Sequence, residues 1–178
     1  MRESSPRCRG VSGSGTGEGS IPGDVVSDHL VIVGFGPAGQ RVAEVMMKER
    51  SLPILVVDLN ASTVELAQSY GLKAYIGDAI REDVLDALHV RTAAAVAVTV
   101  PDPGTARQIV ELVRSLSPDT AIVVRSRYHV HRWQLDVAGA CAVVDEEDGV
   151  GLGIASEVRK RLDALGRRNR PDTNAGRV

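Results

Sequence analysis

The chain has 178 residues, of which 43% are hydrophobic and 25% are charged, which suits a single domain with a substantial core. A formal net charge of -2 provides no basic face for nucleic acid, and an aromatic content of 3% provides few platforms for stacking single-stranded bases. No apolar run approaches the roughly 20 residues of a membrane helix, so we expect no direct insertion into a membrane.

The two ends of the chain differ from its middle. Residues 1–28 are rich in glycine and serine and carry little to bury, so they predict a flexible N-terminal segment. Residues 166–178 are polar and contain several arginines, and they predict a disordered tail. The expected folded domain therefore spans residues 29–165.

Apolar runs and amphipathic runs alternate along this domain. The predicted strands cover residues 30–33, 54–58, 73–76, 94–99, 121–124 and 142–144. The predicted helices include residues 37–50, 60–70, 80–88, 106–113, 128–137 and 154–165. Each strand is a continuous apolar run, which is typical of strands buried on both faces of a parallel sheet. With right-handed crossovers, the pattern predicts an α/β fold, a Rossmann-like doubly wound sheet of six strands in the order 3-2-1-4-5-6.

The turn after the first strand has the spacing G-x-G-x-x-G. Gly34 permits the tight turn, Gly36 lets the backbone approach a pyrophosphate, and Gly39 allows close packing of helix on strand. Asp58 ends the second strand and can accept hydrogen bonds from a ribose diol, whereas it would repel a 2′-phosphate. The pattern favours NAD(H) or another adenosine nucleotide over NADP(H). A turn that binds nothing is the alternative, because Pro37 removes one N–H from the phosphate-facing side.

Residues that could act on a bound nucleotide are missing from the pattern. Hydride transfer needs a substrate pocket and an acid–base group, but the loops are short and no Tyr-x-x-x-Lys pair follows either candidate tyrosine. His129 and His131 are two positions apart, so on a helix they would not share a face that could bind a metal ion. On that helix, we expect Trp133 to point inward. The sequence predicts neither catalytic nor metal-binding residues.

The last helix has acidic residues at its start and an apolar stripe farther along. Glu146, Glu147 and Asp148 suit the positive end of a helix dipole, with an ion-binding rim as the alternative. The stripe at residues 154, 158, 162 and 165 could pack on the chain's own sheet or partly on a partner subunit.

Several motifs together resemble one family of regulatory domains. In chain order they are VIVGFGPAGQRVAE, VVDLN, YIGDA, AVTVPDP, VVRSR and GACAVVDEE. The combination is similar to the N-terminal lobe of the RCK family, also called TrkA-N or KTN domains, which regulate potassium channels and transporters. The section VRSRYHVHRWQLDVAGACAVVDEE is most similar to the cytoplasmic domains of Kef-type monovalent cation:proton antiporters. The resemblance covers residues 29–165.

This resemblance implies a cytoplasmic, nucleotide-sensing regulatory domain or subunit of a potassium or monovalent cation transport system. It implies binding of NAD(H), or of AMP, ADP or ATP, without turnover. It also implies a homodimer and a membrane cation transporter or channel subunit as partner. The family's second lobe and membrane part have no counterpart here, so the chain is expected to be either a fragment or a free-standing subunit. The competing hypothesis is a small NAD-dependent oxidoreductase, or the cofactor-binding half of one.

The resemblance also implies a set of binding residues. They are Gly34, Phe35, Gly36, Pro37, Ala38, Gly39, Asp58, Leu59, Asp78, Ala79, Thr99, Val100, Pro101 and Arg125. Asp78 and Ala79 would line the adenine side, and Arg125 would reach a ligand phosphate or a neighbouring subunit. Two simpler roles stay open: Asp78 as a helix cap and Arg125 as a surface ion-pair partner. Many relatives carry arginine where this chain has Pro37, which favours a mononucleotide such as AMP.

Overall fold

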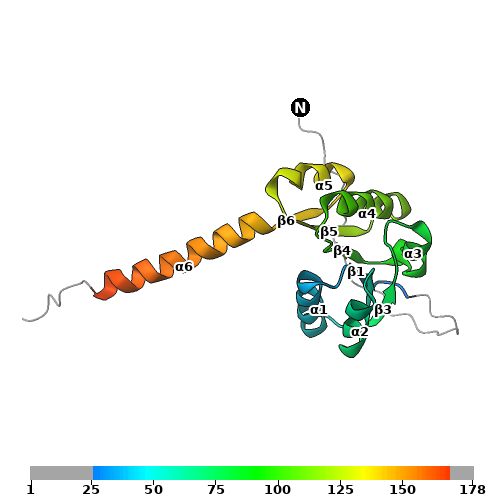
Figure 1. Cartoon of the computed structure of the whole chain (residues 1–178), viewed down its shortest axis with the longest axis horizontal. Helices are drawn as coiled ribbons and strands as arrows, with labels where there is room; N and C mark the ends of the chain where they lie inside the picture. Colours follow the sequence, from blue (N-terminus) through cyan, green and yellow to red (C-terminus); the bar gives the residue numbers. More distant parts are fainter. Residues whose placement is uncertain (1–25, 169–178) are drawn as a thin grey trace, which may run out of the picture.

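The computed structural model describes residues 26–168, so most of the predicted N-terminal segment and the tail from residue 169 lie outside the described part. Its centre is an all-parallel six-stranded sheet in the order β3-β2-β1-β4-β5-β6, as predicted (Figure 1). The strands are β1 Leu30–Val33, β2 Ile54–Asp58, β3 Lys73–Ile76, β4 Ala95–Val98, β5 Ala121–Ser126 and β6 Ala142–Asp145. The strand order reverses between β1 and β4. Strand β1 pairs with β2 on one side and with β4 on the other, in both cases from Leu30 onward.

Helices cover both faces of this sheet. They are α1 Pro37–Glu49, α2 Ala61–Ser69, α3 Glu82–Ala87, α4 Pro103–Leu116, α5 Arg132–Ala138 and α6 Glu146–Arg168, with 3-10 turns η1 Val90–Thr92 and η2 His129–His131. On one face, α1 and α2 bury a core with Ile32, Val56 and Ala43. On the other, α3, α4 and α5 bury a larger core that includes Val110 and Leu135. Both cores form because each central strand is apolar on both sides.

Local signals set the helix ends. Asn60 caps α2 by accepting a hydrogen bond from the backbone N of Ser62, and Asp102 caps α4 in the same way from the backbone N of Thr105. Pro37 occupies the first turn of α1, where its missing N–H costs no helical bond. Gly139 ends α5 with φ 106°, a left-handed conformation that favours glycine.

The inward placement expected for Trp133 is wrong, since this side chain is 62% exposed. Residues 129–131 form the 3-10 turn η2, and α5 begins only at Arg132. The later start changes which positions face the core, and Leu135 takes the buried place with 1% exposure. The helix expected over 128–137 is therefore divided into two short pieces.

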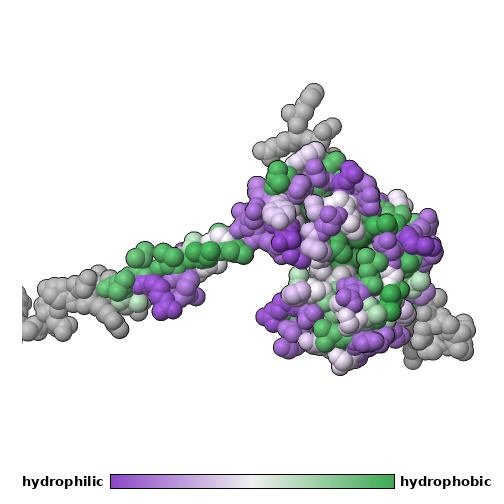
Figure 2. All heavy atoms as spheres, viewed as in Figure 1, coloured by the Kyte–Doolittle hydropathy of each residue, from purple (hydrophilic) through white to green (hydrophobic). Residues whose placement is uncertain are grey.

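Helix α6 projects away from the domain (Figure 1). Its main contacts are with β6 and η2, near its first turn. Its apolar side chains form a continuous exposed stripe (Figure 2). The stripe contains Val150, Ile154, Val158, Leu162 and Leu165, each more than half exposed. Of the two possibilities for this stripe, packing on the chain's own sheet does not occur. No helix within residues 26–168 has the length and apolarity to cross a membrane.

The departure of α6 leaves part of the sheet uncovered. Side chains at alternate positions of β5 and β6 point to the α1 side of the sheet, beyond the reach of α1. Val123 is 39% exposed there and Val144 is 57% exposed. The described structure thus presents two unpartnered apolar surfaces, this open face of β5 and β6 and the stripe of α6.

Candidate functional site

A cavity of about 600 Å³ lies at the carboxyl ends of the strands, where the strand order reverses between β1 and β4. Ligands of doubly wound sheets bind at such a switch point. The predicted residues that line it are Gly34, Gly36, Pro37, Asp58, Leu59, Asp78, Ala79, Thr99, Val100, Pro101 and Arg125. Phe35, Ala38 and Gly39 were predicted as well but do not line the cavity.

The three glycines of the turn have different surroundings. A Cβ on Gly39 would collide with the carbonyl oxygen of Gly34, so this glycine allows helix α1 to approach the end of β1. Gly34 has φ 88°, and a Cβ there would lie 3.1 Å from Thr99 Oγ1. A Cβ on Gly36 would meet nothing within 4 Å. Gly36 therefore faces open space in the cavity at the N-terminus of α1, where free N–H groups and the helix dipole attract an anion.

Phe35 belongs to the core and has no exposed surface. Its ring packs edge-on against Tyr70, with 6.0 Å between the centroids. Its backbone N donates a 2.7 Å hydrogen bond to Asp58 Oδ2, which ties the glycine turn to the end of β2. Phe35 is thus a core residue, and its backbone hydrogen bond to Asp58 holds the glycine turn next to the cavity.

Asp58 is held at the cavity edge by two backbone groups. Phe35 N donates to Oδ2, and Asn60 N donates to Oδ1 at 2.8 Å. A carboxylate has about four acceptor sites, so these two bonds leave capacity for the two hydroxyls of a ribose. A carboxylate fixed in this way suits a neutral diol and opposes a phosphate.

Asp78 and Ala79 line the cavity beyond the end of β3. Asp78 Oδ1 accepts a 3.2 Å hydrogen bond from the backbone N of Ile80. The cap position of α3 belongs to Arg81, so Asp78 stabilises the turn before the helix rather than the helix itself. Ala79 is buried in the larger core and provides an apolar wall.

Thr99 joins the ends of β1 and β4. Its side chain is nearly buried, and Oγ1 donates to the Gly34 carbonyl at 2.7 Å. Its backbone N donates to Val33 O at 2.8 Å. Close by, Asp102 accepts hydrogen bonds from the side chain and backbone of Thr105, and these bonds lower its pKa. The polar groups of Thr99 and Asp102 at the cavity are therefore hydrogen-bonded to other groups of the protein.

Arg125 lies at the end of β5, and its surroundings agree with the simpler of the roles considered for it, that of an ion-pair partner. It lines the cavity, and it forms an ion pair with Glu146 of α6, with 2.5 Å between Nε and Oε1. Its Nη1 also donates to the Thr99 carbonyl at 3.2 Å. A second arginine, Arg127, lines the cavity from the same strand end and lies 5.4 Å from the centroid of the Tyr128 ring.

Some lining residues were not predicted. They are Val33, Val57, Asn60, Thr63, Gly77, Asp102, Thr105, Ile109 and Arg127. The motif RSR carries a usable signal for Arg127, because alternate residues at a strand end point the same way as Arg125. Thr105 and Asp102 follow β4 at the same sheet edge, so topology alone could have placed them at the cavity.

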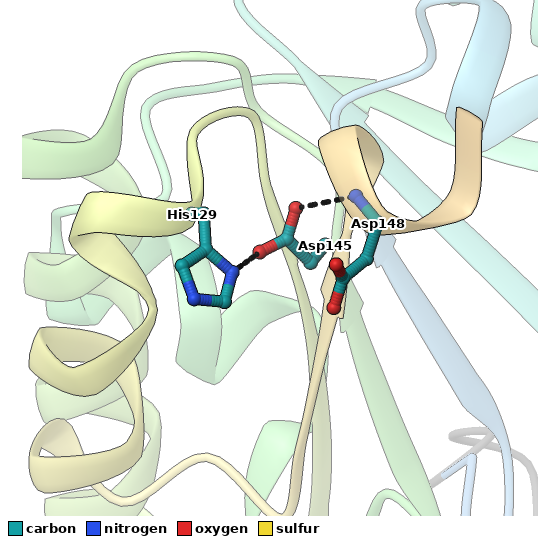
Figure 3. Close-up of side chains that lie close together, drawn as sticks. All are labelled: His129, Asp145 and Asp148. Carbon is teal, nitrogen blue, oxygen red and sulfur yellow. Dashed lines mark hydrogen bonds and ion pairs between the residues drawn. The ribbon is translucent and has the colours of Figure 1, made fainter. Parts of the chain in front are cut away.

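Three other polar side chains meet at the start of α6 (Figure 3). Potential ligand atoms of His129, Asp145 and Asp148 lie within 4.8 Å of one another. Asp145, however, is almost fully buried and accepts bonds from His129 Nδ1 at 2.6 Å and from the backbone N of Glu147 and Asp148. Burial would raise the pKa of Asp145, but these hydrogen bonds outweigh it and hold the pKa below its usual value. The cluster therefore acts as a cap for α6.

Comparison with known proteins places this geometry in a family. The family described as the TrkA-N domain matches residues 30–146. The chain is 33% identical over 135 residues to the chloroplastic K(+) efflux antiporter 1 of Arabidopsis thaliana, covering 76% of this chain and 11% of that protein. It is 32% identical over 143 residues to a putative K(+) efflux antiporter KefB of Alkalimonas amylolytica, covering 80% and 22%. The chain thus spans less than a quarter of the length of these relatives.

Solved structures agree. The Kef CTD of Shewanella denitrificans in its AMP-bound form is similar with a TM-score of 0.63 and 25% identity, over 79% of this chain and 90% of that one. The GsuK channel bound to NAD matches with a TM-score of 0.62 and 25% identity, over 68% of this chain and 22% of that one. The TrkA-N domain of the inner membrane protein ybaL of Escherichia coli shares the fold, with a TM-score of 0.71 at 24% identity over 75% of this chain and 98% of that one. The predicted resemblance and fold are confirmed, and the chain belongs to the TrkA-N domain family.

Proposed function

We propose that this chain is a nucleotide-sensing regulatory domain of a potassium or other monovalent cation transport system. The observation that carries the proposal is the cavity at the switch point, with Gly36 open on one side and Asp58 fixed on the other. Two relatives of similar fold are an AMP-bound Kef domain and an NAD-bound channel, which supports an adenine nucleotide as ligand.

Each part of such a ligand has a matching group. Asp58 would accept hydrogen bonds from the adenosine ribose, and the N-terminus of α1 at Gly36 would receive a phosphate. Ala79 and Asp78 would border the adenine. Pro37 removes one N–H from the phosphate side, so AMP or ADP fits at least as well as NAD(H).

The cavity favours binding without turnover. Among the described residues that line it there is no histidine, cysteine, lysine, tyrosine or serine. Its three carboxylates, Asp58, Asp78 and Asp102, each accept a backbone N–H. The described lining therefore offers no histidine, lysine or tyrosine as a general acid or base, and its carboxylates are engaged by backbone groups, which argues against the competing oxidoreductase.

The partners in this proposal are a second copy of the chain and a membrane cation transporter. The stripe of α6 and the open face of β5 and β6 support the homodimer, because both are apolar and neither is covered within residues 26–168. The relatives that are K(+) efflux antiporters support the transporter, with this domain at its cytoplasmic face.

Thermal unfolding with a panel of nucleotides tests the proposal. NAD, NADH, AMP, ADP and ATP are compared with NADP, each far above a plausible dissociation constant, because binding to the native state raises the midpoint. We expect a shift with NAD(H) or an adenine mononucleotide, none with NADP, and none in Asp58→Ala. Glu65→Ala, an exposed acid on α2 outside the cavity, is the control and should behave as wild type. No shift with any nucleotide would overturn the proposal, and oxidation of NADH with a small carbonyl substrate would favour the oxidoreductase.

A further inference from the structure

Arg125 connects the cavity to α6. Its Nη1 donates to the carbonyl of Thr99 at the cavity, and its Nε faces Glu146, the first residue of α6. The side chain is 23% exposed, whereas that of Glu146 is 37% exposed. The pair thus lies at the rim, where a ligand and a helix could reach the same guanidinium.

The contact with Glu146 does not satisfy Arg125. Although Oε1 lies 2.5 Å from Nε, Arg125 Nε is a buried nitrogen without a hydrogen-bond partner among the described residues, because the two groups are poorly aligned. The pair is therefore held by charge. A better-aligned acceptor would gain a charge-assisted hydrogen bond that Glu146 does not make.

Cations are scarce at the cavity. Arg125 and Arg127 are its only cationic lining residues in the described part of the chain, and Asp58, Asp78 and Asp102 oppose them. Arg127 is exposed and stacks near Tyr128. A phosphate bound near the end of β4 must therefore draw mainly on Arg125 to balance its charge.

We propose that a ligand phosphate and Glu146 compete for Arg125, so that a phosphorylated ligand releases one of the contacts that hold the first turn of α6 to the domain. This inference rests on the proposed nucleotide binding. Other contacts of this turn do not involve Arg125 and stay in place: the cap formed by Asp145 and His129, the hydrogen bond from His129 N to Glu147, and the ion pair of Arg132 with Asp148. Coupling of this kind is reciprocal: whatever draws Glu146 away from Arg125 strengthens binding of the phosphate.

The test measures ADP affinity by titration calorimetry on the full chain. Glu146→Gln leaves Arg125 free and should tighten ADP binding by a factor within the usual range of such couplings, about 5–150-fold. Glu157→Gln removes the same charge from α6 far along the helix, where Glu157 pairs with Arg161, and should leave the affinity unchanged. Thermal unfolding of each variant checks that it is folded.

A double-mutant cycle separates competition from simple repulsion. In an Arg125→Gln background, Glu146→Gln should no longer tighten ADP binding. If it still does, Glu146 acts by repelling the phosphate, and the competition is refuted. Unchanged ADP affinity in Glu146→Gln also refutes it, while the proposed nucleotide binding stands.

Hydrogen exchange on the same samples reports on α6. With ADP, we expect slower exchange in residues 33–40 and faster exchange at the start of α6 around residues 146–150. Protection of the glycine turn without any change in α6 overturns the coupling alone. If ADP protects neither segment, the proposed function fails and this inference fails with it.

Discussion

Alanine at Gly39 and alanine at Gly36 should affect different properties: the first lowers stability, and the second weakens nucleotide binding. In Gly39→Ala the new methyl group collides with the Gly34 carbonyl, which is backbone and cannot swing aside. Overpacking costs about 1–3 kcal/mol, and a collision with backbone lies at the upper end of that range, about 2–3 kcal/mol. The better helix propensity of alanine returns about 1 kcal/mol. We expect a net loss of roughly 1–2 kcal/mol, which at about 2–4 °C per kcal/mol for a domain of this size lowers the unfolding midpoint by about 2–8 °C.

In Gly36→Ala the methyl group enters the open space of the cavity. The backbone at Gly36 has φ -65°, which alanine adopts without strain, so the midpoint without ligand should fall by less than in Gly39→Ala. The methyl group occupies the place of an approaching phosphate, and a clash of about 1–3 kcal/mol weakens ADP binding about 5- to 150-fold. Thermal unfolding and titration calorimetry on both variants give the two readouts. Wild-type affinity in Gly36→Ala, or wild-type stability in Gly39→Ala, would refute the roles assigned to these glycines.

Three further changes probe other parts of the molecule. Because Asp145 has a lowered pKa, it contributes stability above its unfolded pKa of about 4 that is lost as pH falls through the lower folded value. Urea unfolding between pH 2 and 5 should therefore show a steeper acid loss in wild type than in Asp145→Asn, and equal slopes would contradict this. Leu162→Asp in the α6 stripe should dissociate the proposed homodimer in sedimentation velocity, while Lys160→Asp should not; a dimer intact in both places the interface elsewhere. Thr99→Val leaves the Gly34 carbonyl without its donor and should cost about 1–3 kcal/mol in urea unfolding, with Thr99→Ser restoring most of it, and a neutral Thr99→Val would show that water replaces the hydroxyl.

The sheet was predictable because its signals are local. Each central strand is an unbroken apolar run, and the crossover rule then leaves few possible strand orders. The positions of Gly34, Gly36 and Asp58 at the cavity were also predictable, since their spacing follows from the turn and from the end of the next strand. Gly39 was predicted both to bind the ligand and to let helix α1 pack closely on β1. Of these two roles, the structure shows the close packing, and Gly39 does not line the cavity.

Features that depend on distant contacts were harder to predict. Trp133 was misplaced because η2 delays the start of α5 and rotates its faces. The ion pair between Arg125 and Glu146 joins residues 21 positions apart whose meeting depends on how β6 leads into α6. The position of α6 could not be read from its amphipathic pattern, because an apolar stripe does not say what it will contact.

Because α6 projects from the domain, a small rotation of its first turn produces a large displacement of its far end. A helix of 23 residues with a rise of about 1.5 Å per residue is a rod about 34 Å long. If its first turn tilts by about 10°, its far end travels about 6 Å by the geometry of a rigid rod. Under the proposed coupling, a small rearrangement of the Arg125 guanidinium at the base of α6 would therefore produce a displacement of several ångströms at its tip. The domain has the form of a lever whose pivot lies beside the cavity.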